Sequence, residues 1–379
     1  MDAHGTGTPG ETFLGSRAAA AGGEEPRTAE GVSREPRAAE TARKGRRPTM
    51  KEVAAVAGVG LATVSRVVNG RPVRADLTAR VHEAVELLGY QHDHTASSLR
   101  RGDRLSATVG LIFEDVANPF FSAVHRGVED VARQRGVLTY AGSSDGLAER
   151  ERELAASLVA RRVDGLIVAP AAEDQGYLQR ERTAGVALVF VDRPARFLDA
   201  DVVLTDNAGG AAAAVSHLIA HGHRRIAILR RGDRPELHTA SERLRGYRDA
   251  LARHGIPEDP ALIRSAHERP GEALRRLLEA PDPPTAVFTS QNLITVAVVL
   301  AIHELGMQRT LAHVGFDDVA LAGAVEPGLT VIAQDPVAIG RSAAELLFSR
   351  VDGYDGPSRR VVHPATLIAR GSGERPGPT

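Results

Sequence analysis

The chain has 379 residues, a formal net charge of −1 and 42% hydrophobic residues, so it is long enough for two or three domains with sizeable cores. It contains no cysteine, which excludes disulfide bonds, thiolate metal sites and cysteine nucleophiles and suits the cytoplasm. It also lacks a signal-peptide pattern and any apolar run of about eighteen residues, so we expect a cytoplasmic protein without a membrane partner.

Residues 1–47 are rich in Gly, Ala, Glu, Arg and Pro and have neither helical nor strand periodicity. This composition predicts a disordered extension with a basic end. Gly5 to Gly10 match the dinucleotide-binding pattern G-x-G-x-x-G, but no strand precedes the match and no helix can follow it. We therefore regard the match as a coincidence and expect no cofactor.

Residues 48–92 are expected to form a three-helix domain that contains a helix-turn-helix. Thr49 and Glu52 have the spacing of a capping box, which starts a first short helix. Gly58 supplies the sharp turn before a second helix, Leu61 to Val68. The apolar residues expected to face each other across this turn are Val53, Val56, Ala57, Val59, Val64, Val67 and Val68.

The outer face of the second helix has the pattern of a recognition helix, which presents its first turns to the major groove of DNA. Arg66 lies on that face, and its guanidinium fork matches the paired acceptors of guanine. Residues 43–104 contain twelve Lys or Arg and six Asp or Glu, so positive charge gathers here, as contact with DNA phosphates requires. Without that charge, two short helices around a glycine would more often belong to a protein that never contacts DNA.

A third helix and a linker follow. Asp76 is the expected N-cap of the helix from Leu77 to Leu88, and Gly89 ends it. The linker, residues 93–104, has only one or two helical turns, so it would fold only when something holds it.

From residue 105 to residue 370, apolar runs alternate with helix-length amphipathic segments. This rhythm predicts an α/β fold of parallel sheets covered by helices, with ligands beyond the carboxyl ends of the strands. About 265 residues favour two lobes facing a cleft. We expect residues 371–379 to form a disordered tail. The expected strands are 109–113, 137–140, 165–168, 186–191, 225–229, 286–289 and 311–316.

Several motifs occur in one order between Pro48 and about Arg370: KEVAAVAGVGLATVSRVVNG, ANPFF, RRVDGLIVAP, VDR, HLIAHGHRRIAIL, ERLRGY, GFDD and LTVIAQD. In these motifs the chain resembles the LacI/GalR family of transcriptional regulators. The resemblance implies a homodimer that binds a palindromic DNA operator, usually as a repressor, under allosteric control by a small effector, often a sugar. It also implies a two-lobed, periplasmic-binding-protein-like core in which the chain crosses between lobes near Thr205, Gln334 and Pro364.

The resemblance also implies that residues 93–104 form a hinge helix. Such a helix pairs with its twin in the minor groove and inserts a leucine between base steps, a position that Leu99 occupies here. The alternative is that Leu99 packs against the core. The candidate DNA-binding residues are Thr49, Met50, Leu61, Ala62, Thr63, Ser65, Arg66, Asn69, Arg74, Ala96, Leu99 and Arg100.

The candidate effector site lies in the loops that follow the expected strands. An aromatic ring there can pack on the apolar face of a sugar, while planar polar groups bind its hydroxyls. Each residue could instead only cap a helix or order its loop. The candidate effector-binding residues are Asn118, Phe120, Asp192, Arg193, Arg243, Asn292 and Asp317.

The chain departs from the family pattern at several positions. Gly60 stands where a capping serine is usual, and His92-Asp93 where the family mostly has Pro-Asn. Asn292 replaces a common aspartate, which puts the usual sugar assignment in doubt. At the specificity positions, Leu61-Ala62 is an apolar pair that favours thymine methyl groups.

Two other classes of protein share parts of this sequence pattern. Gly142 to Gly146 match the nucleophile-elbow pattern G-x-S-x-G around Ser144, but no oxyanion glycine run accompanies it, so we expect no enzyme. A solute-binding protein would share the core but not the helix-turn-helix or the missing signal peptide. The pairs His92/His94 and His221/His223 lack carboxylates around them, so we expect surface histidines rather than a metal site.

Overall fold

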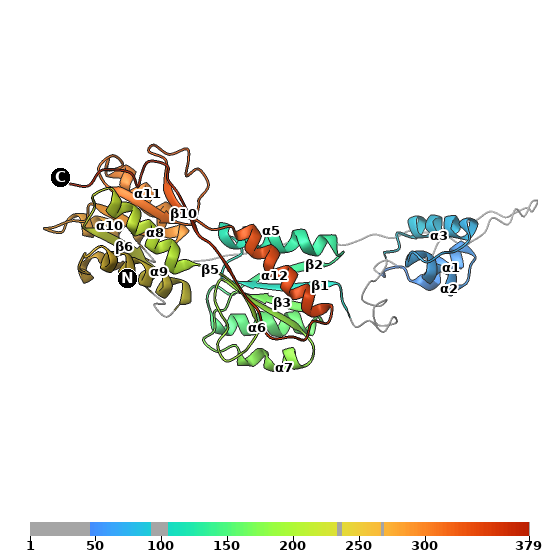
Figure 1. Cartoon of the computed structure of the whole chain (residues 1–379). Helices are drawn as coiled ribbons and strands as arrows, with labels where there is room; N and C mark the ends of the chain where they lie inside the picture. The colour runs from blue at the N-terminus through green and yellow to red at the C-terminus, as the bar shows by residue number, and fades with distance from the viewer. Residues whose placement is uncertain (1–45, 92–104, 233–236, 267–268, 379) are drawn as a thin grey trace, which may run out of the picture. The chain divides into compact units, whose positions relative to one another are not determined.

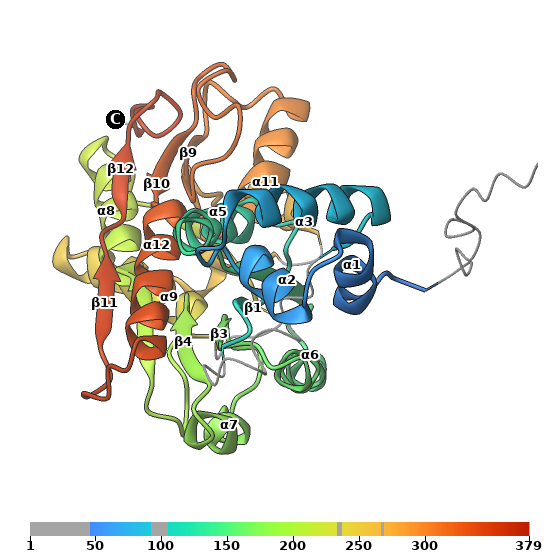
Figure 2. The same cartoon turned by 90° about the vertical axis from the view of Figure 1, so that its right-hand side faces the viewer.

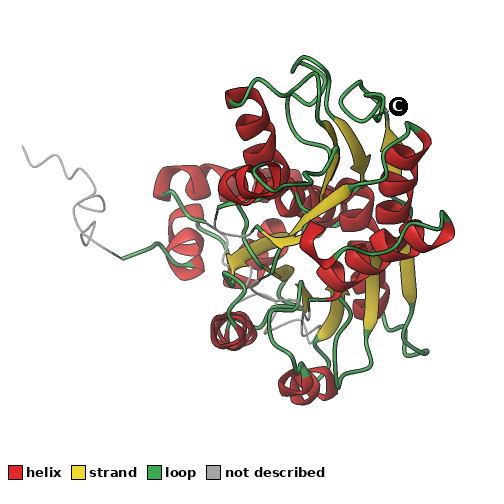
Figure 3. Cartoon of the chain, turned by 90° about the vertical axis from the view of Figure 1, so that its left-hand side faces the viewer, coloured by secondary structure: helices red, strands yellow, loops and turns green. Residues whose placement is uncertain are grey.

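The computed structural model describes residues 46–91, 105–232, 237–266 and 269–378. The chain divides into two compact units after His92, and each is described by itself. In both units the helices and strands follow the helix-turn-helix and α/β patterns expected from the sequence (Figures 1 and 3). Within the described residues, no helix is both long and apolar enough to cross a membrane.

The first unit is a three-helix domain made of α1 (Met50–Ala57), α2 (Leu61–Val68) and α3 (Ala75–Leu88). Its small core includes Val53, Val64 and Val81, each fully buried. Two expectations about this unit are wrong. Val56 is half exposed, because it lies at the edge of the helical face that carries Val53 and Ala57 rather than within it. Asp76 lies inside the first turn of α3 rather than at its N-cap, which is Arg74.

The N-terminal lobe of the second unit contains a six-stranded parallel sheet in the order β11-β5-β4-β3-β1-β2. Helices α5 and α12 pack on one face and α6 on the other, with short α7 following β3. The strands are β1 (Thr108–Phe113), β2 (Leu138–Ser143), β3 (Gly165–Val168), β4 (Ala187–Val191), β5 (Asp201–Thr205) and β11 (Arg360–His363); the helices are α5 (Pro119–Gln134), α6 (Ala148–Ala160), α7 (Gln179–Thr183) and α12 (Pro336–Val351).

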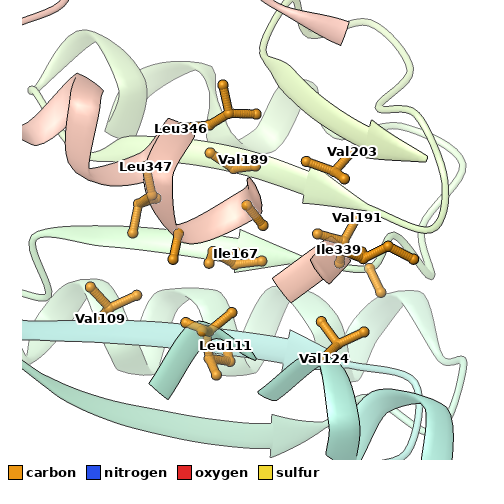
Figure 4. Close-up of a cluster of buried hydrophobic side chains, with 14 of the residues drawn as sticks. Val109, Leu111, Val124, Ile167, Val189, Val191, Val203, Ile339, Leu346 and Leu347 are labelled. Atoms are coloured by element: carbon orange, nitrogen blue, oxygen red, sulfur yellow. The ribbon is translucent and has the colours of Figure 1, made fainter. Parts of the chain in front are cut away.

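The core under α5 and α12 explains why the sequences of these strands are continuous apolar runs. Leu111, Ile167 and Val189 project from neighbouring strands toward Ile339 and Leu347 of α12 (Figure 4). The two helices approach closely at Gly340, where an added Cβ would lie 2.1 Å from the backbone oxygen of Val124. A buried parallel sheet needs such close helical cover on both faces.

The C-terminal lobe contains a second six-stranded sheet in the order β12-β10-β9-β8-β6-β7, in which only β12 is antiparallel to its neighbour. Helices α8 and α9 pack on one face, and α10 and α11 on the other. The strands are β6 (Ile226–Arg230), β7 (Ile263–Ser265), β8 (Ala286–Thr289), β9 (Ala312–Phe316), β10 (Thr330–Ala333) and β12 (Thr366–Ile368); the helices are α8 (Asn207–Ala220), α9 (His238–Arg253), α10 (Pro270–Leu278) and α11 (Asn292–Glu304).

The chain crosses between the lobes three times, at the positions predicted from the family resemblance. β5 ends at Thr205 in the first sheet, and α8 begins the second lobe. β10 ends beside Gln334 and leads back to α12. β11 and β12 then follow one another across the boundary around Pro364 (Figure 2). The carboxyl ends of strands from both sheets therefore meet at the boundary between the lobes.

The prediction of a disordered tail is wrong, because residues 371–378 pack onto the C-terminal lobe. Gly371 forms an isolated parallel bridge with Gly328. Ser372 accepts a hydrogen bond from the His313 amide at 2.9 Å, and its hydroxyl donates to the His313 carbonyl at 2.6 Å. The Glu374 carboxylate accepts from the Thr330 hydroxyl at 2.9 Å. These contacts come from distant parts of the chain, so the Gly- and Pro-rich composition did not reveal them.

Candidate functional site

The helix-turn-helix begins with the predicted capping box. The Thr49 amide donates to Glu52 Oε2 at 2.6 Å, and the Glu52 amide donates back to Thr49 Oγ1 at 3.4 Å. The hydrogen bond from the Thr49 backbone is the largest cause that lowers the pKa of Glu52. Gly58 then adopts a left-handed conformation with φ +60°, which turns the chain toward α2. Gly60 is the N-cap of α2 and provides no side-chain hydrogen bond.

The structure exposes part of the predicted DNA-binding set. Leu61, Ala62 and Arg66 are exposed on α2, whereas Thr63 and Ser65 are half-buried. The Asn69 side chain donates to the Ser65 carbonyl at 2.6 Å and so closes the end of the helix.

The other predicted DNA-binding residues either have structural contacts or lie outside the part of the chain that the structure describes. Met50 packs against the small core, and the Arg74 fork is engaged by Asp76 at 2.6 Å. Ala96, Leu99 and Arg100 lie outside the described residues.

A cavity of about 140 Å³ lies between the two lobes, where the carboxyl ends of the strands meet. It is lined by all seven predicted effector-binding residues. The N-terminal lobe contributes Asn118, Phe120, Asp192 and Arg193, and the C-terminal lobe contributes Arg243, Asn292 and Asp317. The structure therefore brings together residues that lie as far apart in sequence as 118 and 317.

Two carboxylates of the cavity follow strands directly and share an uncommon backbone conformation. Asp192 follows β4 with φ +67°, and Asp317 follows β9 with φ +74°. Non-glycine residues in this region are strained, and such strain gathers at functional sites. Burial raises the pKa of Asp192, while Arg193 and Arg243 act in the opposite direction. The Asp317 carboxylate accepts from the side chain of Gln334 at 2.5 Å and from the Asn292 amide at 3.3 Å.

Arg243 is held rigidly on the C-terminal side of the cavity. Its Nε donates to Asn207 Oδ1 at 2.7 Å, and its Nη1 donates to the Ser290 carbonyl at 2.6 Å. The guanidinium lies 3.7 Å from the centre of the Phe316 ring, close enough for a cation–π interaction. Burial lowers the pKa of Arg243, and the nearby Asp317 carboxylate partly offsets this effect. The side chain is thus fixed before any ligand arrives.

Asn118 has both roles that the sequence left open. Its Oδ1 accepts from the Phe120 amide at 3.0 Å and so caps α5. The same oxygen accepts from Asn292 Nδ2 at 2.7 Å, across the cavity from the other lobe. The cap orients an amide that is also part of the cavity wall.

Sequence reasoning missed several residues of the cavity wall, among them Glu114, Arg231 and Gln334. Glu114 follows β1, and its carboxylate forms ion pairs with Arg193 and with Arg231, which follows β6. These two arginines are the main groups that lower the pKa of Glu114, to about 2, against the opposing effect of burial. The position directly after a strand was a signal that could have identified both Glu114 and Arg231.

The elements expected to be inert have structural roles. Ser144 is fully buried and donates to the Phe113 carbonyl at 3.0 Å, so it is not presented to a substrate. The expectation of a surface histidine is wrong for His223, which is 1% exposed and hydrogen-bonds Thr285 at 2.9 Å and the Arg375 carbonyl at 2.8 Å. His92 and His94 lie outside the described residues. Within the described part of the chain, no group of three or more His, Cys, Asp or Glu residues is arranged to hold a metal.

Comparisons with known proteins agree with this architecture. Residues 49–93 match the family model "Bacterial regulatory proteins, lacI family", and residues 215–373 match a periplasmic binding protein-like domain. The chain is 35% identical to the HTH-type transcriptional regulator PtxS of Pseudomonas aeruginosa over 334 residues, which cover 86% of this chain and 96% of that protein. It is 31% identical to the transcriptional repressor CytR of Escherichia coli over 330 residues, with the same two coverages.

Solved structures give the same picture. The lac repressor dimer bound to operator and the anti-inducer ONPF superposes with a TM-score of 0.75 at 25% identity, covering 86% of this chain and 99% of that chain. The complex of the transcriptional regulator CelR with cellobiose has a TM-score of 0.63 at 31% identity and covers 86% of this chain and all of that chain.

Proposed function

The chain belongs to the LacI family of DNA-binding transcriptional regulators, and from this premise we propose that it is a repressor whose hold on a palindromic operator is controlled by a sugar-class effector in the interlobe cavity. The proposal rests on the cavity, because it brings together the seven side chains predicted from the sequence, six near strand ends of the two lobes and Arg243 on α9. Fixed hydrogen-bonding groups beside the Phe120 ring suit a small polyhydroxylated ligand. The cellobiose bound by CelR is a ligand of the same class.

For the DNA side, we infer that the exposed face of α2 enters the major groove. Leu61 and Ala62 would contact thymine methyl groups, and Arg66 would contact a guanine. Leu99 would insert into the minor groove from a paired hinge. Because DNA is its target, we propose that the protein acts in the cytoplasm.

For the dimer, the described surface offers an apolar stripe on α11. Leu293, Val296 and Leu300 are 54%, 45% and 61% exposed, and their spacing puts them on one helical face. An exposed apolar stripe of this kind is typical of a protein interface. Leu300→Asp should therefore give monomers in sedimentation and weaken operator binding. Leu321→Asp, at a 76% exposed leucine of a C-terminal-lobe loop, is the matched control and should leave the dimer intact.

The main experiment screens neutral and acidic sugars by thermal shift, since a ligand of the folded state raises the melting temperature. Each hit is then added to operator binding measured at fixed salt. Arg243→Ala should abolish the thermal shift caused by the effector and preserve operator binding, while Leu99→Gly should weaken operator binding and preserve the thermal shift. Equal losses in both assays for both variants, or no preference for any genomic fragment over scrambled duplex, would reject the proposal.

A further inference from the structure

One carboxylate links the two lobes at the wall of the cavity. Glu114 forms an ion pair through Oε2 with Arg193 of its own lobe and through Oε1 with Arg231 of the other lobe. The three side chains are only 14%, 7% and 13% exposed. Because the pKa of Glu114 is about 2, the carboxylate is charged throughout the physiological pH range.

The two ion pairs respond differently to separation of the lobes. Arg193 and Glu114 follow β4 and β1 of one sheet, so their contact survives any movement of one lobe against the other. Arg231 follows β6 of the second sheet, so opening of the cleft must pull it away from Glu114. Breaking a largely buried ion pair is costly, because it leaves each charge with less compensation than before. The Glu114–Arg231 contact therefore opposes opening.

Among the described residues, the hydrogen bonds that cross the cleft join neutral groups, while Arg243 also attracts the Asp192 carboxylate from the other lobe. Asn118 and Asn292 exchange amide hydrogen bonds of 2.7 and 3.4 Å inside the cavity. Thr205 donates to Gln334 where two strands cross between the lobes. Hydrogen bonds between charged partners are roughly twice as strong as neutral ones. A ligand in the cavity would compete directly with the amide pair.

We propose that the Glu114–Arg231 ion pair is an interlobe latch that keeps the cleft closed without effector. The ion pair closes the cleft whatever the protein does, and only its role in regulation depends on the proposed function. The effector replaces the Asn118–Asn292 amide pair inside a cleft that is already closed, rather than driving the closure. Glu114 and Arg231 are thus positioning residues of the cavity, and Arg193 supports Glu114 from its own lobe.

The absence of cysteine makes the latch directly measurable in the full chain. Ala184→Cys, after α7, and Ala280→Cys, after α10, introduce one exposed spin-label site on each lobe. Labelled chains are mixed with excess unlabelled chain so that each assembly carries one labelled pair. Pulsed electron–electron double resonance without sugar or DNA should give one narrow distance between the two spin labels. Glu114→Gln and Arg231→Gln should each lengthen it by more than about 2 Å or add a longer population.

Matched variants separate the latch from general damage. Arg248→Gln breaks an ion pair with Glu258 inside the C-terminal lobe and should leave the distance unchanged. The double variant of Glu114 and Arg231 should open no further than either single variant, because both remove one interaction. Should Glu114→Gln fail to fold by circular dichroism, Arg231→Gln provides the same test.

The proposal is overturned if the single variants keep the original distance, if Arg248→Gln opens the cleft as much as Arg231→Gln, or if the double variant opens additively. None of these distances involves effector or operator. A failure of the sugar screen would therefore reject the proposed function and leave the latch standing, and a closed cleft in Arg231→Gln would do the opposite.

Discussion

Replacing Asp201 by Asn should make the stability of the core less dependent on pH. Asp201 begins β5 and is fully buried, yet it accepts hydrogen bonds from Arg350 at 2.9 and 3.0 Å and from Arg359 at 2.7 Å. These bonds hold the pKa of Asp201 at about 2, below its ordinary value of 3.8, although burial acts in the other direction. The carboxylate thereby ties the last turn of α12 and the start of β11 to the first sheet.

The size of the effect follows from the pKa difference. A shift from 3.8 to about 2 corresponds to about 2 kcal/mol of stability, present above pH 4. Because the folded pKa is the lower one, this contribution falls as the pH drops toward about 2, and about 1 kcal/mol is already lost between about pH 6 and pH 3. The difference in unfolding free energy between wild type and Asp201→Asn should shrink by that amount over this range.

Urea unfolding followed by far-ultraviolet circular dichroism measures this difference, since the chain has no tryptophan to report by fluorescence. Asp318→Asn is the control, because its ion pair with Arg370 is far more exposed and should contribute less than about 1 kcal/mol. A gap between wild type and Asp201→Asn that stays constant from pH 6 to pH 3 would refute the reasoning.

Three further predictions concern backbone fit and burial. Gly60→Ser should stabilise the helix-turn-helix by a few tenths of a kcal/mol, because φ −69° and ψ 150° suit a capping serine, whereas Gly58→Ser at φ +60° should cost about 1 kcal/mol or more; hydrogen exchange of the α2 amides measures both. Gly340→Ala should cost about 1–3 kcal/mol in urea unfolding through its clash with a backbone oxygen, and Gly323→Ala, which meets nothing within 4 Å, should cost far less. Burial lowers the pKa of His313 to about 3, so below about pH 6.5 the unfolded chain takes up a proton that the folded chain refuses; wild type should lose about 2 kcal/mol between pH 7 and pH 5 relative to His313→Gln, and equal pH profiles would contradict this.

Much of the fold was predictable because its signals are local. The capping box at Thr49 and the left-handed turn at Gly58 depend only on neighbours in sequence, and both were confirmed. Strands such as β3 and β8 are continuous apolar runs because they are buried on both faces. Short strands lack this signal and were not predicted. β11 and β12 are four and three residues long and are separated by Pro364, so no run of either period marks them.

The positions of the predicted effector residues were accessible for a topological reason. In a parallel sheet every strand delivers its following residue to the same edge, so Asp192 after β4 and Asp317 after β9 were expected beside the cleft. The tail was inaccessible for the opposite reason. Ser372 and Glu374 are ordered by partners forty or more residues away, such as His313 and Thr330, while the residues directly around them are mostly glycine.

The ion-pair partner of Arg193 could not be predicted from the sequence. In sequence its nearest carboxylate is Asp192, and the two lie within 3.1 Å, yet that contact satisfies no hydrogen bond from Nε. The guanidinium instead engages Glu114, which follows a strand two places away in the order β4-β3-β1. Strand ends identify which residues reach the cleft, but the spatial order of the strands decides which of them meet. That order depends on how whole helices pack between strands, and no motif of a few residues encodes it.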